Sequence, residues 1–335
     1  MYRRKSRTFG LWILILAVLL RVFFVGGVMH LRNKVVSMVS SNAMFRLLLS
    51  VATGTEISQP QRQNPQVWVL HRAPAPSKVA PTIAPPTAEE GESISIQNAT
   101  TYTISKTDAV QRQTPVSATD GPAVLIIHTH TTEAYTPSSG YEYKASDRMR
   151  TMDLSKSVVR VGEELAQTLA SRGIEVLHDK TIHDYPDFNS AYTTTAQHIA
   201  QWLEKYPSIQ AVIDVHRDAV EYADGTAKYL SATLADGTVS APLMLVVGTD
   251  KGGLYHPNWQ DNLAWCVKLQ ALLERENAGL CRPLNLRKER FNGHFTPKSF
   301  ILEVGTTGNT LPEALVAVRA FGESFADLWE LNTVK

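Results

Sequence analysis

The chain has 335 residues, enough for one large domain or two smaller ones with accessory segments. Its formal net charge of +1 provides no strongly basic or acidic field, so nucleic acid is excluded as the expected partner. Two cysteines, Cys266 and Cys281, are too few for a disulfide framework or a thiolate zinc cluster. We expect both to be reduced core residues; one disulfide is the alternative if the domain lies outside the cytoplasm.

Residues 1–30 are predicted to form a cytoplasmic basic tail and a transmembrane anchor. The stretch from Phe9 to Met29 is apolar except for Arg21, and a bilayer requires roughly 20 such residues. An arginine near a helix centre costs about 2.5–3.5 kcal/mol on insertion scales, which the apolar neighbours can offset. The basic residues precede the span, so the positive-inside rule places the rest of the chain outside the cytoplasm. A cleaved signal peptide is the alternative, although no small-x-small site follows closely.

A juxtamembrane segment (31–54) and a linker (55–121) are expected next. The linker is rich in Pro, Ser, Thr and Gln and has almost no sustained apolar periodicity. Such a segment cannot bury enough surface to offset its ordering entropy. We therefore predict a disordered, semi-extended spacer, which implies a target some distance from the membrane.

Residues 122–335 alternate between strand-like and helix-like segments, which predicts a single α/β domain with a mostly parallel or mixed sheet flanked by helices. The last helix should begin at Thr310, which forms a capping box with Glu313. The predicted strands are 123–127, 174–179, 209–215, 241–248 and 299–305, and the other predicted helices are 155–173, 194–206 and 258–279.

Polar side chains follow three of these apolar strands at the point where each strand ends. His128 and His130 come after the first and His216 after the third, and Glu303 follows the apolar residues 299–302 of the last. Functional groups of open α/β sheets gather beyond the carboxyl ends of the strands, so we expect these side chains to lie close together. A strand-end histidine that only caps backbone carbonyls is the alternative for any one of them.

Nitrogen and oxygen ligands without cysteine suit zinc, with three protein ligands and one open position in hydrolytic sites. At a spacing of two residues on an extended chain, His128 and His130 would face the same side and could share one metal. Glu303 follows four apolar residues, and burial there would raise the pKa of its carboxyl toward the range of a general base. The pattern therefore indicates metal-assisted amide hydrolysis.

Several motifs together resemble the stage II sporulation protein P (SpoIIP) family of endospore-forming bacteria, over roughly residues 120–330. They are "HTHTTEAY", "VVRVGEEL", "HDKTIHDYPDFNSAY", "VIDVHRDA", "RFN" and "LEVGTTGNTLPEAL". The resemblance implies a zinc-dependent N-acetylmuramoyl-L-alanine amidase that also cuts peptide cross-links of peptidoglycan during forespore engulfment. It also implies a fold related to that of the zinc amidases, and partners similar to the transglycosylase SpoIID and the membrane protein SpoIIM.

The resemblance assigns His130 and His216 to the metal and Glu303 to catalysis. The acidic third ligand is expected to be Glu133, with Glu142 and Asp153 as alternatives; Asp153 also suits a helix N-cap.

The remaining expectations concern the surroundings of the metal. His128 should support the site from behind the ligands, and Arg217 and Asp218 should lock His216 or bind a substrate carboxylate. Arg290 and Asn292 could contact a glycan or peptide group. His178 and His183, in "HDKTIHDYP", are expected to be substrate-side or structural residues.

Two other functions stay open at this stage. One is a zinc-dependent protein peptidase or deacetylase, which the tether to the wall side disfavours. The other is a wall-binding scaffold without activity, which the intact His130, His216 and Glu303 disfavour. The expected location is the cell membrane, with a single span and the domain on the wall side.

Overall fold

The computed structural model describes residues 67–70 and 83–334, which fall within one unit that spans Pro65–Lys335. The predicted anchor and juxtamembrane segment lie outside the described residues. Within the described ranges, no helix has the length and apolarity needed to cross a bilayer.

An eight-stranded mixed sheet forms the centre of this unit. The strands β6, β3, β7 and β12 run parallel to one another, whereas β1 is antiparallel to β6 and β10 is antiparallel to β12. On the far edge, β11 and β2 run parallel to β10. In spatial order the strands are β1 (Val67–Leu70), β6 (Val176–Asp179), β3 (Val124–Ile127), β7 (Ala211–Asp218), β12 (Ser299–Thr306), β10 (Leu243–Gly248), β11 (Leu284–Arg287) and β2 (Ile96–Asn98).

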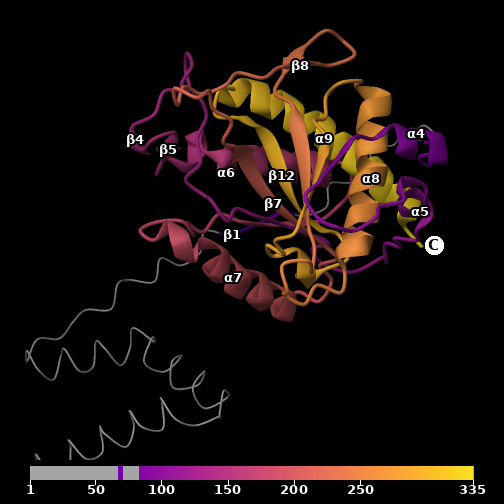
Figure 1. Cartoon of the computed structure of the whole chain (residues 1–335). Helices are drawn as coiled ribbons and strands as arrows, with labels where there is room; N and C mark the ends of the chain where they lie inside the picture. Colours follow the sequence, from indigo (N-terminus) through magenta and orange to yellow (C-terminus); the bar gives the residue numbers. More distant parts are fainter. Residues whose placement is uncertain (1–66, 71–82, 335) are drawn as a thin grey trace, which may run out of the picture. The chain divides into compact units, whose positions relative to one another are not determined.

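Helices cover both faces of the sheet, as Figure 1 shows. The larger core lies between one face and the helices α6 (Val158–Ser171), α8 (Trp259–Glu276) and α9 (Leu311–Asn332). A smaller core lies on the other face, against α7 (Ala191–Lys205). The predicted α/β class, its mostly parallel sheet and all of the predicted helices and strands are confirmed.

Strand alternation distributes the side chains between the two faces. On β7, Ile213 and Val215 belong to the larger core, whereas Val212 belongs to the core beneath α7. Asp214 and His216 therefore point to the α7 face. The capping box of α9 is also present: the Glu313 carboxylate accepts a hydrogen bond from the Thr310 backbone N–H at 2.7 Å.

The segment 83–121 differs from the predicted linker, because it packs on the domain. Ile94 and Val116 are 2% and 1% exposed, and β2 adds a strand to the sheet. Two short helices, α4 (Ala88–Ser93) and α5 (Lys106–Gln111), lie against α8. Helices of six residues are too short for an apolar period to be recognised, so composition alone suggested disorder.

Other small elements were also absent from the prediction. They are β11; β1, which lies within the predicted linker and pairs with β6; and two short hairpins, β4 (Ala145–Asp147) with β5 (Arg150–Thr151) and β8 (Ala232–Thr233) with β9 (Val239–Ser240). Both cysteines are free thiols, as expected for reduced residues.

Arg275 of α8 holds the beginning of segment 83–121 against the domain. Its guanidinium donates to both carboxylate oxygens of Glu90 at 2.6 and 2.7 Å and to the Ala84 carbonyl at 2.8 Å. We expect Arg275→Ala to cost about 1 kcal/mol of local stability, and hence to speed proteolysis within 83–93 about fivefold. Limited proteolysis followed by mass spectrometry measures this. Arg287→Ala, which removes an ion pair with nearby Glu289, is the matched control, and equal cleavage in both variants would contradict the role of Arg275.

Helix α6 approaches the sheet at Gly162, over two buried histidines. A methyl group on Gly162 would come 2.6 Å from the His128 ring and 2.9 Å from His178 Nε2. The His128 ring cannot move away easily, because Nδ1 is 2.9 Å from the Val215 carbonyl oxygen and Nε2 is 2.9 Å from His178 Nε2.

Whether Gly162→Ala raises or lowers the free energy of unfolding tests this packing. Helix propensity alone would make alanine about 1 kcal/mol more stable than glycine. We expect the steric conflict to dominate and the free energy of unfolding to fall by about 1–3 kcal/mol. Urea denaturation measures the difference, and a stabilised variant would show that α6 and the histidines are not tightly packed.

Candidate active site

A cavity of about 390 Å³ opens at the carboxyl ends of β7 and β12. Six of the residues singled out from the sequence line it: His130, Glu133, His216, Arg217, Asp218 and Glu303. The polar side chains at the ends of these strands therefore lie close together, as predicted from the sequence. His128, Arg290 and Asn292 do not belong to this lining.

The pairing of β7 with β12 places His216 beside Glu303. These two residues are partners in the parallel register, so their side chains leave the sheet on the same face. Asp214 lies two residues before His216 and shares that face. Polar side chains thus occupy adjacent positions where both strands end.

His216 is held between two carboxylates. Its Nδ1 atom lies 3.5 Å from Glu133 Oε2, and its Nε2 atom lies 2.9 Å from Asp214 Oδ1. The second contact is short enough for an ion pair but is not aligned as a hydrogen bond. Burial opposes the charged imidazole, but the carboxylates of Asp214 and Glu133 prevail and raise the pKa of His216 well above its usual value.

Asp214 is in turn fixed by the first strand end. The Thr129 backbone N–H donates to Asp214 Oδ1 at 2.8 Å, and the Thr129 hydroxyl donates to Oδ2 at 2.6 Å. A carboxylate that orients the far nitrogen of a histidine is a common support for a metal ligand. The threonine that follows His128 therefore acts on His216 through Asp214.

Glu133 is the acidic candidate that lies beside His216. It is 6% exposed, and its Oε2 atom accepts from the Arg217 backbone N–H at 3.2 Å. Burial opposes its ionisation, but His216 and Arg217 lower the pKa of the Glu133 carboxyl to about 2. Glu133 is therefore an anion.

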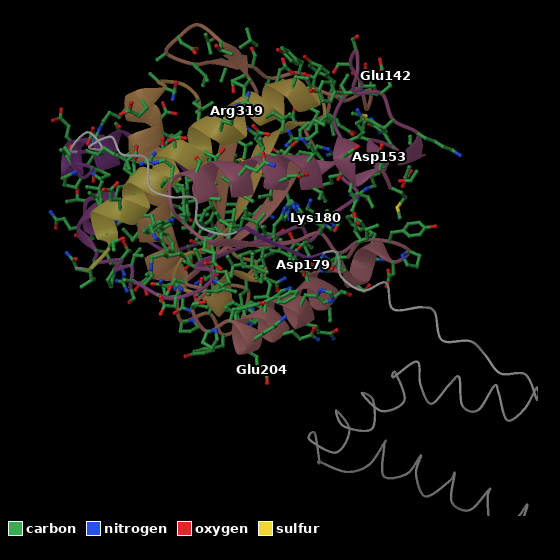
Figure 2. The ribbon with its side chains drawn as sticks, turned by 180° about the vertical axis from the view of Figure 1, so that it is seen from behind. Glu142, Asp153, Asp179, Lys180, Glu204 and Arg319 are labelled. Atoms are coloured by element: carbon green, nitrogen blue, oxygen red, sulfur yellow. The ribbon has the colours of Figure 1, made fainter. Side chains whose placement is uncertain are left out.

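The two alternatives to Glu133 lie elsewhere. Glu142 is exposed, and Asp153 caps a 3-10 turn, where its Oδ1 accepts from the Ser155 backbone N–H at 3.0 Å. Figure 2 shows both at the periphery of the domain. Neither lines the cavity.

Glu303 faces the same cavity without a partner for one of its oxygens. Its Oε2 atom is shielded from solvent and has no hydrogen bond. Burial raises the pKa of the Glu303 carboxyl to about 8; His216 opposes this effect, and the carboxylate of Glu133 adds to it. A shielded carboxyl with a free oxygen and a pKa near neutrality can accept and return a proton.

His130 forms the aromatic side of the cavity. Its ring stacks on Phe188 with centroids 4.3 Å apart and meets Tyr192 edge-on at 5.6 Å. The rings of His130 and His216 are 5.3 Å apart. The Nδ1 atom of His130 is buried and lacks a hydrogen-bond partner.

The donor atoms in this cavity are of the types that zinc uses. Glu133 Oε2 and His216 Nδ1, at 3.5 Å, are separated as two ligands of one tetrahedral ion would be, at roughly 3.3 Å for the usual bond lengths. His130 supplies an unpartnered nitrogen but stands farther off. Among the described residues, the one group of three such side chains whose donor atoms all lie within 4.8 Å of one another is a different one, Asp179, His183 and His198.

The other residues predicted for the site have structural contacts. Arg217 donates to the carbonyls of Ala134 at 2.8 Å and Met149 at 2.9 Å, so its side chain holds the loops around Glu133. Asp218 accepts from Arg282 at 2.5 Å. His128 faces α6, on the opposite side of the sheet from His216.

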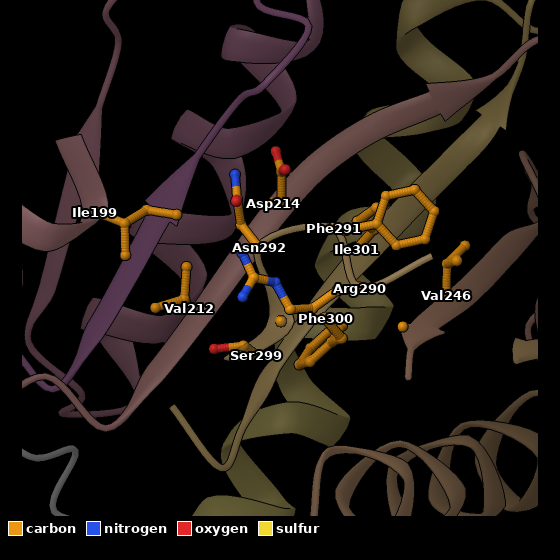
Figure 3. Close-up of a pocket in the computed structure, with 12 residues that line it drawn as sticks. Ile199, Val212, Asp214, Val246, Arg290, Phe291, Asn292, Ser299, Phe300 and Ile301 are labelled. Carbon is orange, nitrogen blue, oxygen red and sulfur yellow. The ribbon is translucent and has the colours of Figure 1, made fainter. Parts of the chain in front are cut away.

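Arg290 and Asn292 lie near a second, very small cavity of about 10 Å³, which Figure 3 shows between β7, β12 and the 290–293 loop. Such a volume holds about one water molecule. Asn292 donates to the Tyr192 carbonyl at 3.1 Å, and Arg290 donates to the Tyr255 carbonyl at 3.1 Å. Their contacts position the loop rather than line the larger cavity.

Four residues near this cavity, Asp214, Arg150, Phe188 and Tyr192, were not predicted from the sequence. Asp214 could have been predicted, because it precedes His216 by two residues on a strand and its side chain must lie on the same face of the sheet. The other three come from a hairpin and from the start of α7, and no sequence pattern connects these segments to His130. Arg150 places its guanidinium 4.6 Å above the Phe188 ring.

We expect Asp214→Asn to lower the free energy of unfolding by about 1–3 kcal/mol, because an amide cannot accept both hydrogen bonds from Thr129 or neutralise His216. Urea denaturation measures the change. Asp236→Asn is the control, since Asp236 lies in an exposed turn, where it accepts from the Thr238 backbone N–H. Equal stability of the two variants would mean that Asp214 is not a buried anchor.

Comparison with known proteins gives one consistent result. The profile of the stage II sporulation protein P (SpoIIP) family matches residues 52–326. The stage II sporulation protein P of Bacillus subtilis (strain 168) is 26% identical over 242 residues. That alignment covers 68% of this chain and 57% of the relative, so the chain spans little more than half of the relative's length.

Proposed function

Because the chain belongs to the stage II sporulation protein P family, we propose that it is a peptidoglycan hydrolase that acts in forespore engulfment during sporulation. The proposed reaction is the hydrolysis of the amide bond between N-acetylmuramic acid and L-alanine, with additional cleavage of peptide cross-links. The observation that carries the proposal is the in-register pair of His216 and Glu303 in one cavity.

His130, Glu133 and His216 would hold a zinc ion in this proposal. Support comes from the donor types, from the 3.5 Å spacing of Glu133 Oε2 and His216 Nδ1, and from the unpartnered Nδ1 atom of His130. When bound, zinc would polarise the scissile carbonyl and lower the pKa of a water molecule to about 7.

Glu303 would move the proton. Its shielded Oε2 atom has no partner and can take a proton from the attacking water. The same carboxyl would return this proton to the leaving amide nitrogen. Arg217 and Asp214 would act by position: the first holds the loop of Glu133, and the second orients His216.

The location and partners are further parts of the proposal. Residues 1–30 would anchor the chain in the membrane, and the domain would face the wall. A transglycosylase similar to SpoIID and a membrane protein similar to SpoIIM are the proposed partners. A protein peptidase, a deacetylase and an inactive wall-binding scaffold are the competing functions.

The test is digestion of purified peptidoglycan by the full-length chain in detergent, with and without a zinc chelator. Mass spectrometry should detect free stem peptides and peptide-free glycan. We expect chelation to abolish these products and Glu303→Gln to reduce their rate by at least about 100-fold, since a positioned acid–base group contributes about that much or more.

Glu323→Gln is the matched control, because Glu323 is an exposed carboxylate of α9 that pairs with Arg172. It should leave the rate unchanged. Intact stems with the zinc-loaded wild-type chain, including in the presence of a transglycosylase partner, would refute the amidase. Cleavage only between amino acids would favour an endopeptidase.

A further inference from the structure

A second group of metal-binding side chains lies on the α7 face of the sheet. Asp179 ends β6, His183 lies on the loop that follows, and His198 belongs to α7. One donor atom of each lies within 4.8 Å of the others. Figure 2 shows Asp179 above α7, apart from the peripheral acidic residues.

His183 has a buried ring nitrogen without a hydrogen-bond partner. Its Nδ1 atom lies 2.9 Å from the His128 carbonyl oxygen, and since a carbonyl only accepts, Nδ1 carries the hydrogen. The lone pair is therefore on Nε2. This atom is buried and has no hydrogen-bond partner, in a residue that is 3% exposed.

The contacts of His183 resemble those of a metal-ligating histidine. Ligating histidines usually donate their second ring N–H to a backbone carbonyl or a carboxylate, which fixes the tautomer. A buried acceptor that stays unsatisfied costs about 1–3 kcal/mol. A bound cation would remove that cost.

Asp179 and His198 complete the group. Asp179 is fully buried, and its Oδ2 atom lies 3.2 Å from His198 Nδ1 and 2.7 Å from Trp202 Nε1. A simple anchoring of α7 to β6 explains these two hydrogen bonds. It does not explain the free Nε2 atom of His183, whose ring centroid is 4.8 Å from that of His198.

We propose that Asp179, His183 and His198 bind a divalent cation of the zinc class, separate from the ion of the proposed function. Two imidazoles and one carboxylate favour Zn²⁺, Co²⁺ or Ni²⁺ over Mg²⁺ and Ca²⁺, which prefer oxygen ligands. The ion has a structural role, because it joins the end of β6, the following loop and α7.

This position connects the ion to the larger cavity. The loop that contains His183 continues to Phe188, which stacks on His130, and α7 contributes Tyr192 to the same wall. The cation holds this aromatic wall in place and contacts no reacting atom. The inference does not require the cavity to be an amidase site.

The test is the metal content of the full-length chain, purified in detergent, loaded with zinc and dialysed to remove weakly bound ions. His183→Gln and His198→Gln should each lose about one ion per chain relative to wild type. Trp202→Phe is the matched control: it removes a hydrogen bond from the same carboxylate but leaves all three ligands, so it should retain the ion.

Thermal unfolding provides a second measurement. Zinc should raise the unfolding temperature of wild type and Trp202→Phe more than that of the two histidine variants, because a ligand that binds only the folded state stabilises it. We expect His198→Gln to fold even if His183→Gln does not, because the His198 side chain is 21% exposed and its replacement disturbs little packing. Loss of zinc in His198→Gln can therefore be attributed to the missing ligand.

The outcomes distinguish the two sites. If the histidine variants and wild type hold equal amounts of zinc, including none, the second site is refuted. If His183→Gln and His198→Gln lose an ion that His216→Gln retains, the second site is supported whatever the activity on peptidoglycan. If only His216→Gln loses zinc, the ion belongs to the active-site cavity alone.

Discussion

The parallel pairing of β7 with β12 is the constraint on which the candidate site depends. It aligns His216 with Glu303, and the alternation of each strand turns both side chains to the α7 face. A shift of the register by one residue would send Glu303 to the larger core, where a carboxylate has no partner. The apolar residues that pack on α6 and α9 therefore determine the site indirectly, because they select this register.

The polar groups at these strand ends are costly to bury, and the neighbouring loop compensates. Thr129 satisfies Asp214, and Arg217 connects Ala134 and Met149 while its backbone N–H supports Glu133. These hydrogen bonds support the buried carboxylates from the neighbouring loop. His130 Nδ1, His216 Nε2 and Glu303 Oε2 are buried without a hydrogen-bond partner, and all three residues line the cavity. Buried polar atoms without a partner are rare in folded proteins, and a catalytic role is one physical reason for them.

Histidines close to one another in this protein have different roles, which depend on where each lies in the fold. His128 is packed under Gly162 and bonded to His178, so it serves the fold. His130, two residues later, leaves the strand and turns to the cavity. His183 binds the backbone of His128 through one nitrogen and leaves the other free. One short segment therefore contributes to the core, to the candidate active site and to the proposed second cation site.

The α/β class, the principal helices and strands, and the strand ends that collect polar side chains could all be predicted from the amino-acid sequence. These follow from local patterns: apolar periods, capping residues and the rule that parallel strands deliver their carboxyl ends to one edge. The same rule could have identified Asp214 from its spacing to His216. Family membership was also readable from the motifs.

Which of these residues contact one another depends on long-range packing and could not be predicted from the sequence. His128 and His130 do not face the same side, because β3 ends at Ile127. Beyond that residue the chain is no longer extended, and side chains stop alternating between the two faces. Phe188, Tyr192 and Arg150 lie near His130 because of the paths of the segments that contain them. Those paths depend on contacts between residues far apart in the sequence. The packing of residues 83–121 depended on partners such as Arg275, far along the chain. Such contacts leave no local period, because their free energy comes from surfaces that only the folded chain brings together.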